Sequence, residues 1–141
     1  MVEIIKGKLW LGDVDDANDL HFLEINNINT IICCAKELLY KVQSVVEVHY
    51  FLVDDDDTYI NFDVIINLIN QSNRVLVHCL AGINRSPTVV ASYLIKQLKM
   101  NDAIEYIKKL KHDIDPNFTF LLMLEKLKLD NLECLEVEVF K

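Results

Sequence analysis

The chain has 141 residues, of which 52% are hydrophobic and 26% are charged, and its formal net charge is −8. This length and composition predict one globular domain over 1–141, and no apolar run approaches the roughly 18 residues of a membrane-spanning helix. The negative charge argues against a protein that coats nucleic acid, because neutralising phosphates needs a basic surface, but it permits a small pocket for one phosphate group.

The N-terminal half alternates short apolar runs with polar segments. EIIKGKLWLG predicts two short strands around Gly7, and DVDD predicts the start of a helix that reaches about Asn26. The inward face of this helix is expected to carry Ala17, Leu20 and Leu23. INTIICC, VEVHYFLV and RVLVH are rich in β-branched and aromatic residues, which predicts buried strands. Between the last two, YINFDVIINLINQS has apolar residues at helical spacing.

From Ser86 onward the apolar residues recur with a period of 3.6, which predicts three helices: PTVVASYLIKQLK, NDAIEYIKKLKH and NFTFLLMLEKLKL. Pro87 suits the first turn of the first helix. Asn101 or Asp102 can cap the second helix and Asn117 the third. Strands joined by helices, followed by a helical cluster, predict an α/β domain with a mostly parallel central sheet of about five strands flanked by helices.

The acidic tail over 130–141 ends in a different pattern. CLEVEVFK alternates Leu135, Val137 and Val139 with two glutamates, as a strand would. We expect either a frayed tail or an extra edge strand, which would pair within the domain or with a second copy in a homodimer.

The four cysteines, at positions 33, 34, 79 and 134, lack the spacing of a disulfide framework. MVEIIKGKLW has no long apolar stretch of a secretory signal, so we expect reduced thiols in a cytoplasmic or nuclear setting. Cys33 and Cys34 lie on an apolar strand and are interpreted as core residues. Without a C-x₂-C pair, the spacing does not support a zinc site at His78 and Cys79, and we expect no metal or cofactor.

The stretch RVLVHCLAGINRSPT carries the most restrictive chemical pattern. The strand ends at Cys79, at the carboxyl edge of the sheet where α/β proteins bind ligands. The loop 80–84 can direct successive backbone N–H groups at one centre, and the helix that opens at Arg85 adds the positive charge of its N-terminus. This arrangement predicts a cradle for a dianionic phosphate.

Each polar side chain of this stretch has a predicted role. The field that attracts phosphate also stabilises a Cys79 thiolate, since thiol pKa values beside cations at helix N-termini fall from about 8.5 to roughly 3.5–7.5. Arg85 offers a planar fork for two phosphate oxygens. Ser86 can donate a hydrogen bond to the sulfur, and His78 is expected to orient the loop and not to act as a base. An inert core cysteine, the alternative, leaves the arginine and serine without a role.

Nine residues follow the order H-C-x-x-G-x-x-R-S: His78, Cys79, Leu80, Ala81, Gly82, Ile83, Asn84, Arg85 and Ser86. This run resembles the signature of the cysteine-dependent protein tyrosine phosphatases, and the Ala-Gly and Ser-Pro pairs look like the dual-specificity branch. KLWLGDVDDAND resembles the opening of that branch and IDPNFTFLLMLE its last helix, so the likeness covers roughly 4–128. Lys111 and His112 stand where the family often carries an arginine, and the tail has no counterpart.

The resemblance also implies a general acid on a loop after the preceding strand, where 54–57 are four aspartates. Such an acid protonates the leaving oxygen and typically contributes about 10²–10⁴-fold in rate. Asp54 follows VEVHYFLV directly, so the strand aims it most firmly, and we assign it as the acid. Asp55 is the alternative, and the other two are expected to be loop charge.

The resemblance implies a metal-independent protein phosphatase in which Cys79 forms a cysteinyl-phosphate while Asp54 protonates the leaving group. The short chain lacks loops that deepen a phosphotyrosine pocket, which implies phosphoprotein substrates bearing phosphotyrosine or phosphoserine/threonine. A phosphoinositide phosphatase and an RNA 5′-phosphatase are alternatives, disfavoured by a loop without lysine and by the net charge. A phosphate-binding module without catalysis and a scaffold that uses the acidic tail are further alternatives.

Overall fold

A mixed sheet forms the centre of the molecule, which a computed structural model describes for residues 1–42, 44, 46–56 and 59–139, with side chains described up to residue 130. The strands are β1 (Val2–Ile5), β2 (Leu9–Gly12), β3 (Thr30–Cys33), β4 (Glu47–Tyr50) and β5 (Val75–His78). Their order is β1-β2-β5-β3-β4, with β1 antiparallel to β2 and the other neighbours parallel. The predicted α/β architecture with a mostly parallel five-stranded sheet is confirmed.

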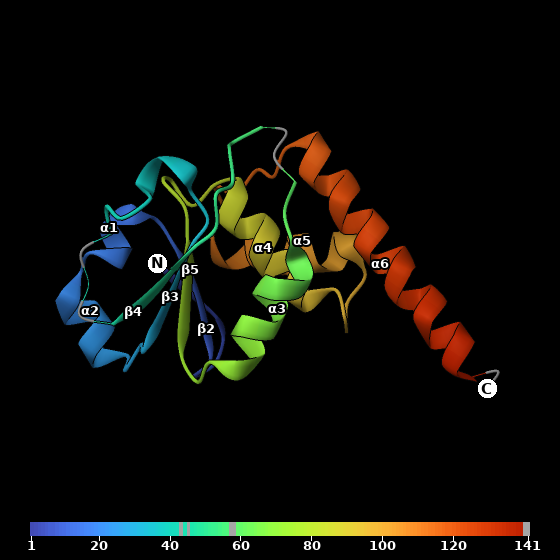
Figure 1. Cartoon of the computed structure of the whole chain (residues 1–141), viewed down its shortest axis with the longest axis horizontal. Coiled ribbons are helices and arrows are strands. Elements are labelled where there is room, and N and C mark those ends of the chain that lie inside the picture. The colour runs from blue at the N-terminus through green and yellow to red at the C-terminus, as the bar shows by residue number, and fades with distance from the viewer. Residues whose placement is uncertain (43, 45, 57–58, 140–141) are drawn as a thin grey trace.

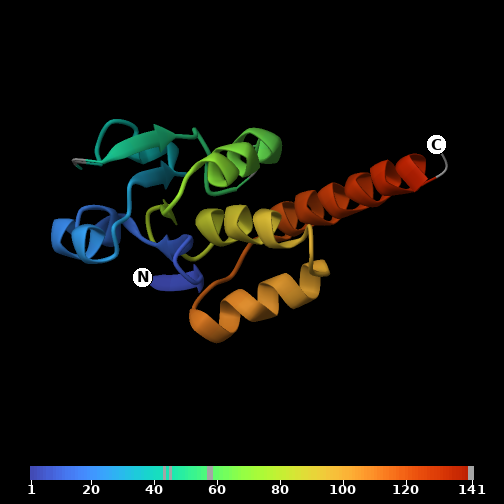
Figure 2. The ribbon, with the colours of Figure 1, turned by 90° about the horizontal axis from the view of Figure 1, so that it is seen from below.

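Helices cover both faces of the sheet, as Figures 1 and 2 show. One face carries the short helices α1 (Val14–Ala17) and α2 (Leu20–Ile25). The other carries α3 (Phe62–Gln71), α4 (Arg85–Leu94), α5 (Met100–Leu110) and α6 (Phe118–Val139). A 3₁₀ turn, η1 (Lys36–Leu38), follows β3. The three helices predicted after Ser86 are therefore present, and none of the described helices has the length and apolar character needed to cross a bilayer.

Consecutive residues of the central strands feed two separate cores, because side chains alternate between the faces of a sheet. Ile31 of β3 and Leu76 of β5 pack with Trp10 in the core beneath α1 and α2. Their neighbours Ile32 and Val77 pack on the opposite face, with the helices α3 to α6. The central strands are thus buried on both faces, which explains their near-continuous apolar sequences.

The single helix predicted from the DVDD stretch to Asn26 is instead two short helices. Asp13 caps α1 in a reciprocal pair of hydrogen bonds with Asp16, each 2.9 Å long. Asp19 then caps α2 by accepting from the backbone N–H of Phe22 at 3.1 Å. The second cap begins a separate helix at Leu20, whose side chain is 46% exposed and does not face inward as predicted.

The predicted caps of the last two helices have different outcomes. Asn117 caps α6, since its side-chain oxygen accepts from the backbone N–H of Phe120 at 2.8 Å. Asn101 and Asp102, however, lie inside α5, whose N-cap is Lys99 with no side-chain hydrogen bond. The helix begins earlier, at Met100, whose side chain packs against the core.

The edge strand predicted in the tail is wrong for residues 134–139, because α6 continues as a helix to Val139. No glycine or proline follows Pro116, and leucine and glutamate are good helix formers, so nothing in the sequence stops the helix. A homodimer through such a strand loses its basis, and residues 140–141 lie outside the described part. In both ribbon views the end of α6 reaches away from the body of the molecule (Figures 1 and 2).

Two phenylalanines at the start of α6 test how this helix packs. Phe120 is fully buried, whereas Phe118 is 74% exposed. Phe120→Ala should lower the free energy of unfolding by about 3–5 kcal/mol, through lost burial and the cavity left behind. The matched control Phe118→Ala should change it by less than about 0.5 kcal/mol. Urea unfolding measures both, and equal losses would contradict this packing of α6.

Candidate active site

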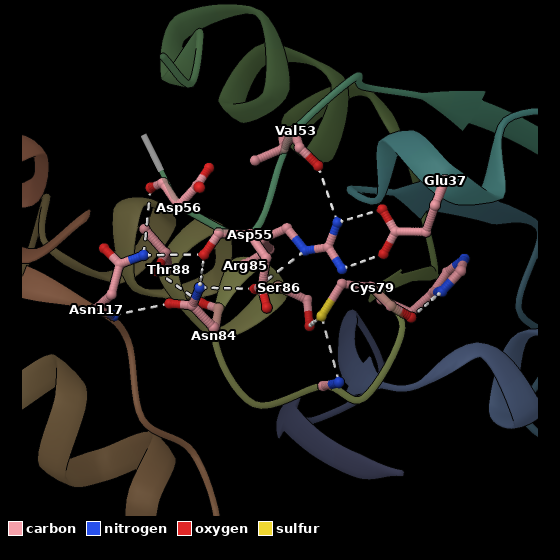
Figure 3. A network of polar contacts seen from close by, with 12 residues as sticks. Glu37, Val53, Asp55, Asp56, Cys79, Asn84, Arg85, Ser86, Thr88 and Asn117 are labelled. Atoms are coloured by element: carbon pink, nitrogen blue, oxygen red, sulfur yellow. Dashed lines mark hydrogen bonds and ion pairs between the residues drawn. The ribbon is translucent and has the colours of Figure 1, made fainter. Parts of the chain in front are cut away.

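The loop between β5 and α4 places the sulfur of Cys79 within hydrogen-bond distance of a backbone N–H and a hydroxyl group (Figure 3). Cys79 directly follows β5 and is 2% exposed. Its Sγ accepts the backbone N–H of Gly82 at 3.3 Å and lies 3.1 Å from Oγ of Ser86, in the first turn of α4. These donors and the N-terminus of α4 stabilise negative charge on the sulfur.

The loop can take this shape because Gly82 has no side chain. Its φ is +71°, in the left-handed region that favours glycine, and an added Cβ would lie 2.8 Å from the carbonyl oxygen of Gly12. The loop is also fastened to the start of α1, where the backbone N–H of Val14 donates to the carbonyl of Leu80 at 3.1 Å. Residues 80–84, the predicted phosphate loop, therefore lie directly against the end of β2.

The guanidinium of Arg85 is buried and held by two neighbours. Its Nη1 donates to Glu37 Oε2 at 2.7 Å and to the carbonyl of Val53 at 2.9 Å, and its Nη2 donates to Glu37 Oε1 at 2.5 Å. A guanidinium has five N–H donors, so these contacts leave two for another ligand. One of them is on Nε, which is buried, has no hydrogen-bond partner among the described residues and lies 3.5 Å from Asp55 Oδ1.

Glu37 is the functional residue that the sequence analysis missed. It lies in η1, immediately beyond β3, and its hydrogen bond from Arg85 holds the pKa of its carboxyl below the usual value. The carboxyl ends of parallel strands meet at one edge of the sheet, so an acid just after the strand beside β5 was a usable signal.

The structure places the two candidate acids differently. Asp54 Oδ2 lies 3.7 Å from Lys36 Nζ, and its side chain is 50% exposed. Asp55 accepts from Nδ2 of Asn84 at 2.8 Å and faces Nε of Arg85. A hollow of about 170 Å³ is lined by Asp55, Cys79, Leu80, Ala81, Ile83, Asn84 and Arg85. The predicted alternative acid, Asp55, is thus the aspartate in this lining, and Asp54 is not part of it.

Two asparagines tie the loop of Asp55 to the phosphate loop and to α6 (Figure 3). Asn84 Nδ2 also donates to the carbonyl of Asp55 at 2.9 Å, and Asn84 Oδ1 accepts from the backbone N–H of Asn117 at 2.7 Å. Asn117 Nδ2 in turn donates to the carbonyls of Asp55 and Asp56 at 3.1 and 3.3 Å. Asn84, predicted in the phosphate loop, and Asn117, predicted as a helix cap, therefore also hold the loop of Asp55 in place.

His78 lies behind the loop and is fully buried. Its Nδ1 is 2.9 Å from the carbonyl oxygen of Cys79, so Nδ1 carries the hydrogen and donates. Burial lowers the pKa of His78, which favours the neutral ring. This position agrees with the expected role of orienting the loop.

The two cysteines at the end of β3 are buried free thiols. Burial raises the pKa of Cys33 to about 11 and that of Cys34 well above its usual value. A thiol with a raised pKa is a poor nucleophile. Both are therefore core residues, as expected, although they lie near Cys79.

The sequence is similar to a known protein family and to individual members of it. Residues 9–128 match the family model described as dual specificity phosphatase, catalytic domain. The chain is 35% identical over 134 residues to dual specificity protein phosphatase Mpk3 of Drosophila melanogaster, covering 87% of this chain and 33% of that protein. It is 33% identical over 138 residues to dual specificity protein phosphatase 1B of Arabidopsis thaliana, covering 88% and 79%. The chain thus spans about a third of the length of Mpk3.

Solved structures of phosphatases and phosphatase-like proteins resemble this fold as well. The human tyrosine phosphatase-like serine/threonine/tyrosine-interacting protein superposes with a TM-score of 0.85 and 27% identity, covering 94% of this chain and 97% of that one. DUSP15 gives a TM-score of 0.77 with 29% identity, covering 94% and 95%.

The pair of Glu37 and Arg85 predicts a pH-dependent contribution to stability. The pKa of Glu37 is lowered in the folded state, so this contribution is present above the unfolded value of about 4.3 and is lost as the pH falls through the folded value. Hydrogen bonds to charged groups contribute about 1.5–3 kcal/mol, and solvent screening at an exposed carboxylate reduces this to about 1 kcal/mol.

Glu37→Gln should therefore have a lower free energy of unfolding than the wild type at pH 7, and the difference between the two should narrow below about pH 4. Urea unfolding across this range measures the gap. The control Glu125→Gln changes an exposed glutamate on α6 and should show no such trend. If the difference in unfolding free energy between Glu37→Gln and the wild type widened toward low pH, a lowered pKa of Glu37 in the folded state would be contradicted.

Proposed function

The chain belongs to the dual specificity phosphatase family, and from this premise we propose that it hydrolyses phosphate monoesters of proteins through a cysteinyl-phosphate intermediate. One observation carries the proposal: Cys79 and Arg85, whose Nε has no hydrogen-bond partner among the described residues, line the same hollow. A nucleophile and a buried cation facing one small hollow suit a phosphate group that is attacked where it binds.

The first step transfers the phosphoryl group to sulfur. The phosphate binds to the backbone N–H groups of 80–84 and to Arg85, which spreads its charge over several donors. The Cys79 thiolate forms a bond to phosphorus while the bond from phosphorus to the ester oxygen breaks. An acid gives its proton to that oxygen, so the substrate leaves as an alcohol or a phenol.

We assign this acid to Asp55 in place of Asp54, which becomes the alternative. Asp55 lines the hollow and is held there by Asn84, and the network of Asn84 and Asn117 holds its backbone. Asp54 is oriented toward Lys36, beside the hollow. Geometry is the first requirement for a general acid, and Asp55 meets it better.

The second step returns the enzyme to its starting state. Water attacks phosphorus, the Asp55 carboxylate takes a proton from this water, and the bond from sulfur to phosphorus breaks. Ser86 Oγ, 3.1 Å from the sulfur, is placed to donate a hydrogen bond to the departing thiolate. The proton accepted by Asp55 then serves the next cycle.

The proposed substrates are proteins that carry phosphotyrosine or phosphoserine/threonine. Leu80 and Ile83 line the hollow and are 47% and 36% exposed, so apolar side chains are available there to contact either kind of substrate side chain. Phosphoinositides and RNA 5′ ends remain alternatives, which the lysine-free loop and the net charge of −8 disfavour. The described cysteines are free thiols, which supports the expected cytoplasmic or nuclear setting.

A phosphate-binding protein without catalysis is the second candidate, because one similar structure is described as a phosphatase-like interacting protein. The contact of Cys79 Sγ with Ser86 Oγ and the place of Arg85 in the same hollow favour catalysis here.

Hydrolysis of aryl phosphates tests the mechanism and the choice of acid. Cys79→Ser should abolish turnover of p-nitrophenyl phosphate, and undiminished turnover would overturn the proposal. Asp55→Ala should lower kcat for phenyl phosphate by about 10²–10⁴-fold, and Asp54→Ala by less than about threefold. The loss in Asp55→Ala should be smaller for p-nitrophenyl phosphate, because its leaving group needs less protonation. A larger loss in Asp54→Ala would return the role to Asp54.

A further inference from the structure

Asn84 occupies the N-cap position of α4 without capping the helix. Asparagine is among the preferred N-cap residues, because its side-chain oxygen accepts from the backbone N–H of the second or third helical residue. Here the side chain makes no such hydrogen bond. The third helical residue is Pro87, which has no N–H, and the second is Ser86, beside the sulfur of Cys79. The Asn84 side chain therefore leaves the first turn of α4 to a ligand and is available for another role.

The side-chain amide of Asn84 has a fixed orientation. The backbone carbonyl of the residue accepts from Thr88 Oγ1 at 2.8 Å and from the Thr88 N–H at 3.2 Å, which anchors it on α4. Its side-chain oxygen accepts from the backbone N–H of Asn117 at 2.7 Å. With the oxygen bound in this way, the two N–H donors of the amide are directed at Asp55. The amide is thus aligned by its anchor on α4 and by the segment before α6.

Asp55 needs such a neighbour because its side chain is 71% exposed. An exposed side chain samples several rotamers, and fixing one of them costs conformational entropy. Asn84 Nδ2 donates to Asp55 Oδ1 at 2.8 Å and to the Asp55 carbonyl at 2.9 Å, so it holds both the carboxyl group and the backbone that carries it. A second side chain near Oδ1 is Arg85, whose Nε is 3.5 Å away. Under the proposed function Arg85 binds the phosphate, which leaves Asn84 to hold the carboxyl.

We propose that Asn84 is the positioning residue for the proton donor of this site, and that its side chain acts through the Asp55 carboxyl and not on the substrate. The inference rests on the proposed function and extends it to the residue that orients the acid. Because Asn84 donates to Oδ1, the transferable proton of Asp55 is carried by Oδ2. The backbone of Asn84 belongs to the phosphate loop, so one residue links phosphate binding to proton transfer.

The dependence of the rate on the leaving group measures this role. Phenol is a poorer leaving group than p-nitrophenol and needs protonation more, so loss of a well-placed acid widens the difference between the two phosphates. Asn84→Ala should lower kcat/KM for phenyl phosphate by about 10–10²-fold, the cost of misplacing a reacting group by about 1 Å. It should lower kcat/KM for p-nitrophenyl phosphate by less than about fivefold. Loss of folded protein or of phosphate affinity would lower both by the same factor.

Double variants test whether Asn84 acts through Asp55. The effects of residues that work as one unit are not additive. In the Asp55→Ala background, Asn84→Ala should therefore lower kcat/KM for phenyl phosphate by less than about threefold further. In the Asp54→Ala background, Asn84→Ala should keep its full effect. Losses that multiply with those of Asp55→Ala, or that vanish in Asp54→Ala, would overturn the proposal.

Two further variants separate this role from a general effect on the fold. The control Asn67→Ala removes an exposed asparagine from α3 and should leave kcat/KM unchanged for both phosphates. Asn84→Ser keeps a side chain that can cap α4, which favours folding, but its single hydroxyl hydrogen cannot serve both acceptors of Asp55. It should widen the difference between the two phosphates by about tenfold. A wild-type ratio of the two kcat/KM values in Asn84→Ser would contradict the proposal.

Failure of the proposed function gives a different result. If the wild type does not turn over p-nitrophenyl phosphate, catalysis is rejected and the role of Asn84 with it. If the wild type is active, equal losses for the two phosphates in Asn84→Ala reject only the role of Asn84. A larger loss in Asp54→Ala than in Asp55→Ala would mean that Asn84 holds a carboxyl other than the acid. That outcome overturns the inference and leaves the cysteinyl-phosphate mechanism in place.

Discussion

A buried cation organises this molecule, because the guanidinium of Arg85 lies where three parallel strands end. Arg85 follows β5, its partner Glu37 follows β3, and the carbonyl of Val53 lies beyond β4. Moving a charge out of water is costly unless the charge is paired and hydrogen-bonded. The fold meets this requirement with Glu37 and Val53, which follow two neighbouring strands. The N–H donors of Arg85 that these two partners do not use remain for the hollow that Arg85 and Cys79 line. Structural pairing and the proposed phosphate binding therefore use different edges of one side chain.

The second organising feature links segments that are far apart in the chain. Asn84 in the phosphate loop and Asn117 before α6 both hold the loop of Asp55. Hydrogen bonds thus join the loop of Cys79, the loop of Asp55 and the start of the last helix (Figure 3). The proposed acid depends for its position on a residue 62 places away along the chain.

The sequence predicts best where one local pattern determines the result. Buried strands are apolar on both faces, and the run from His78 to Ser86 encodes strand, loop and helix in nine residues, so both were readable. The tail shows the opposite case. Its alternation over 134–139 suits a strand, yet an uninterrupted helix precedes it, and the alternation alone does not stop that helix.

Features that depend on tertiary contacts were harder to predict. Two adjacent aspartates have the same chemistry, and it is their tertiary contacts, with Asn84 and Arg85 for Asp55 and with Lys36 for Asp54, that distinguish them. Glu37 follows a predicted strand, which was a usable signal, but its partner Arg85 lies 48 residues away along the chain. Leu20 was misplaced because the cap at Asp19 breaks the helical period on which the inward face was predicted.

The contact between two glycines has a practical consequence for redesign. A Cβ at Gly12 would lie 2.6 Å from Asp16 Oδ2, and a Cβ at Gly82 would lie 2.8 Å from the backbone of Gly12. A side chain at Gly82 would displace the loop that carries Cys79, and a side chain at Gly12 would displace the side chain of Asp16, which takes part in the cap of α1. Leu80 and Ile83, which belong to the same loop, line the hollow and are partly exposed. A library meant to redirect the protein to new esters should therefore randomise 80 and 83 and keep both glycines constant.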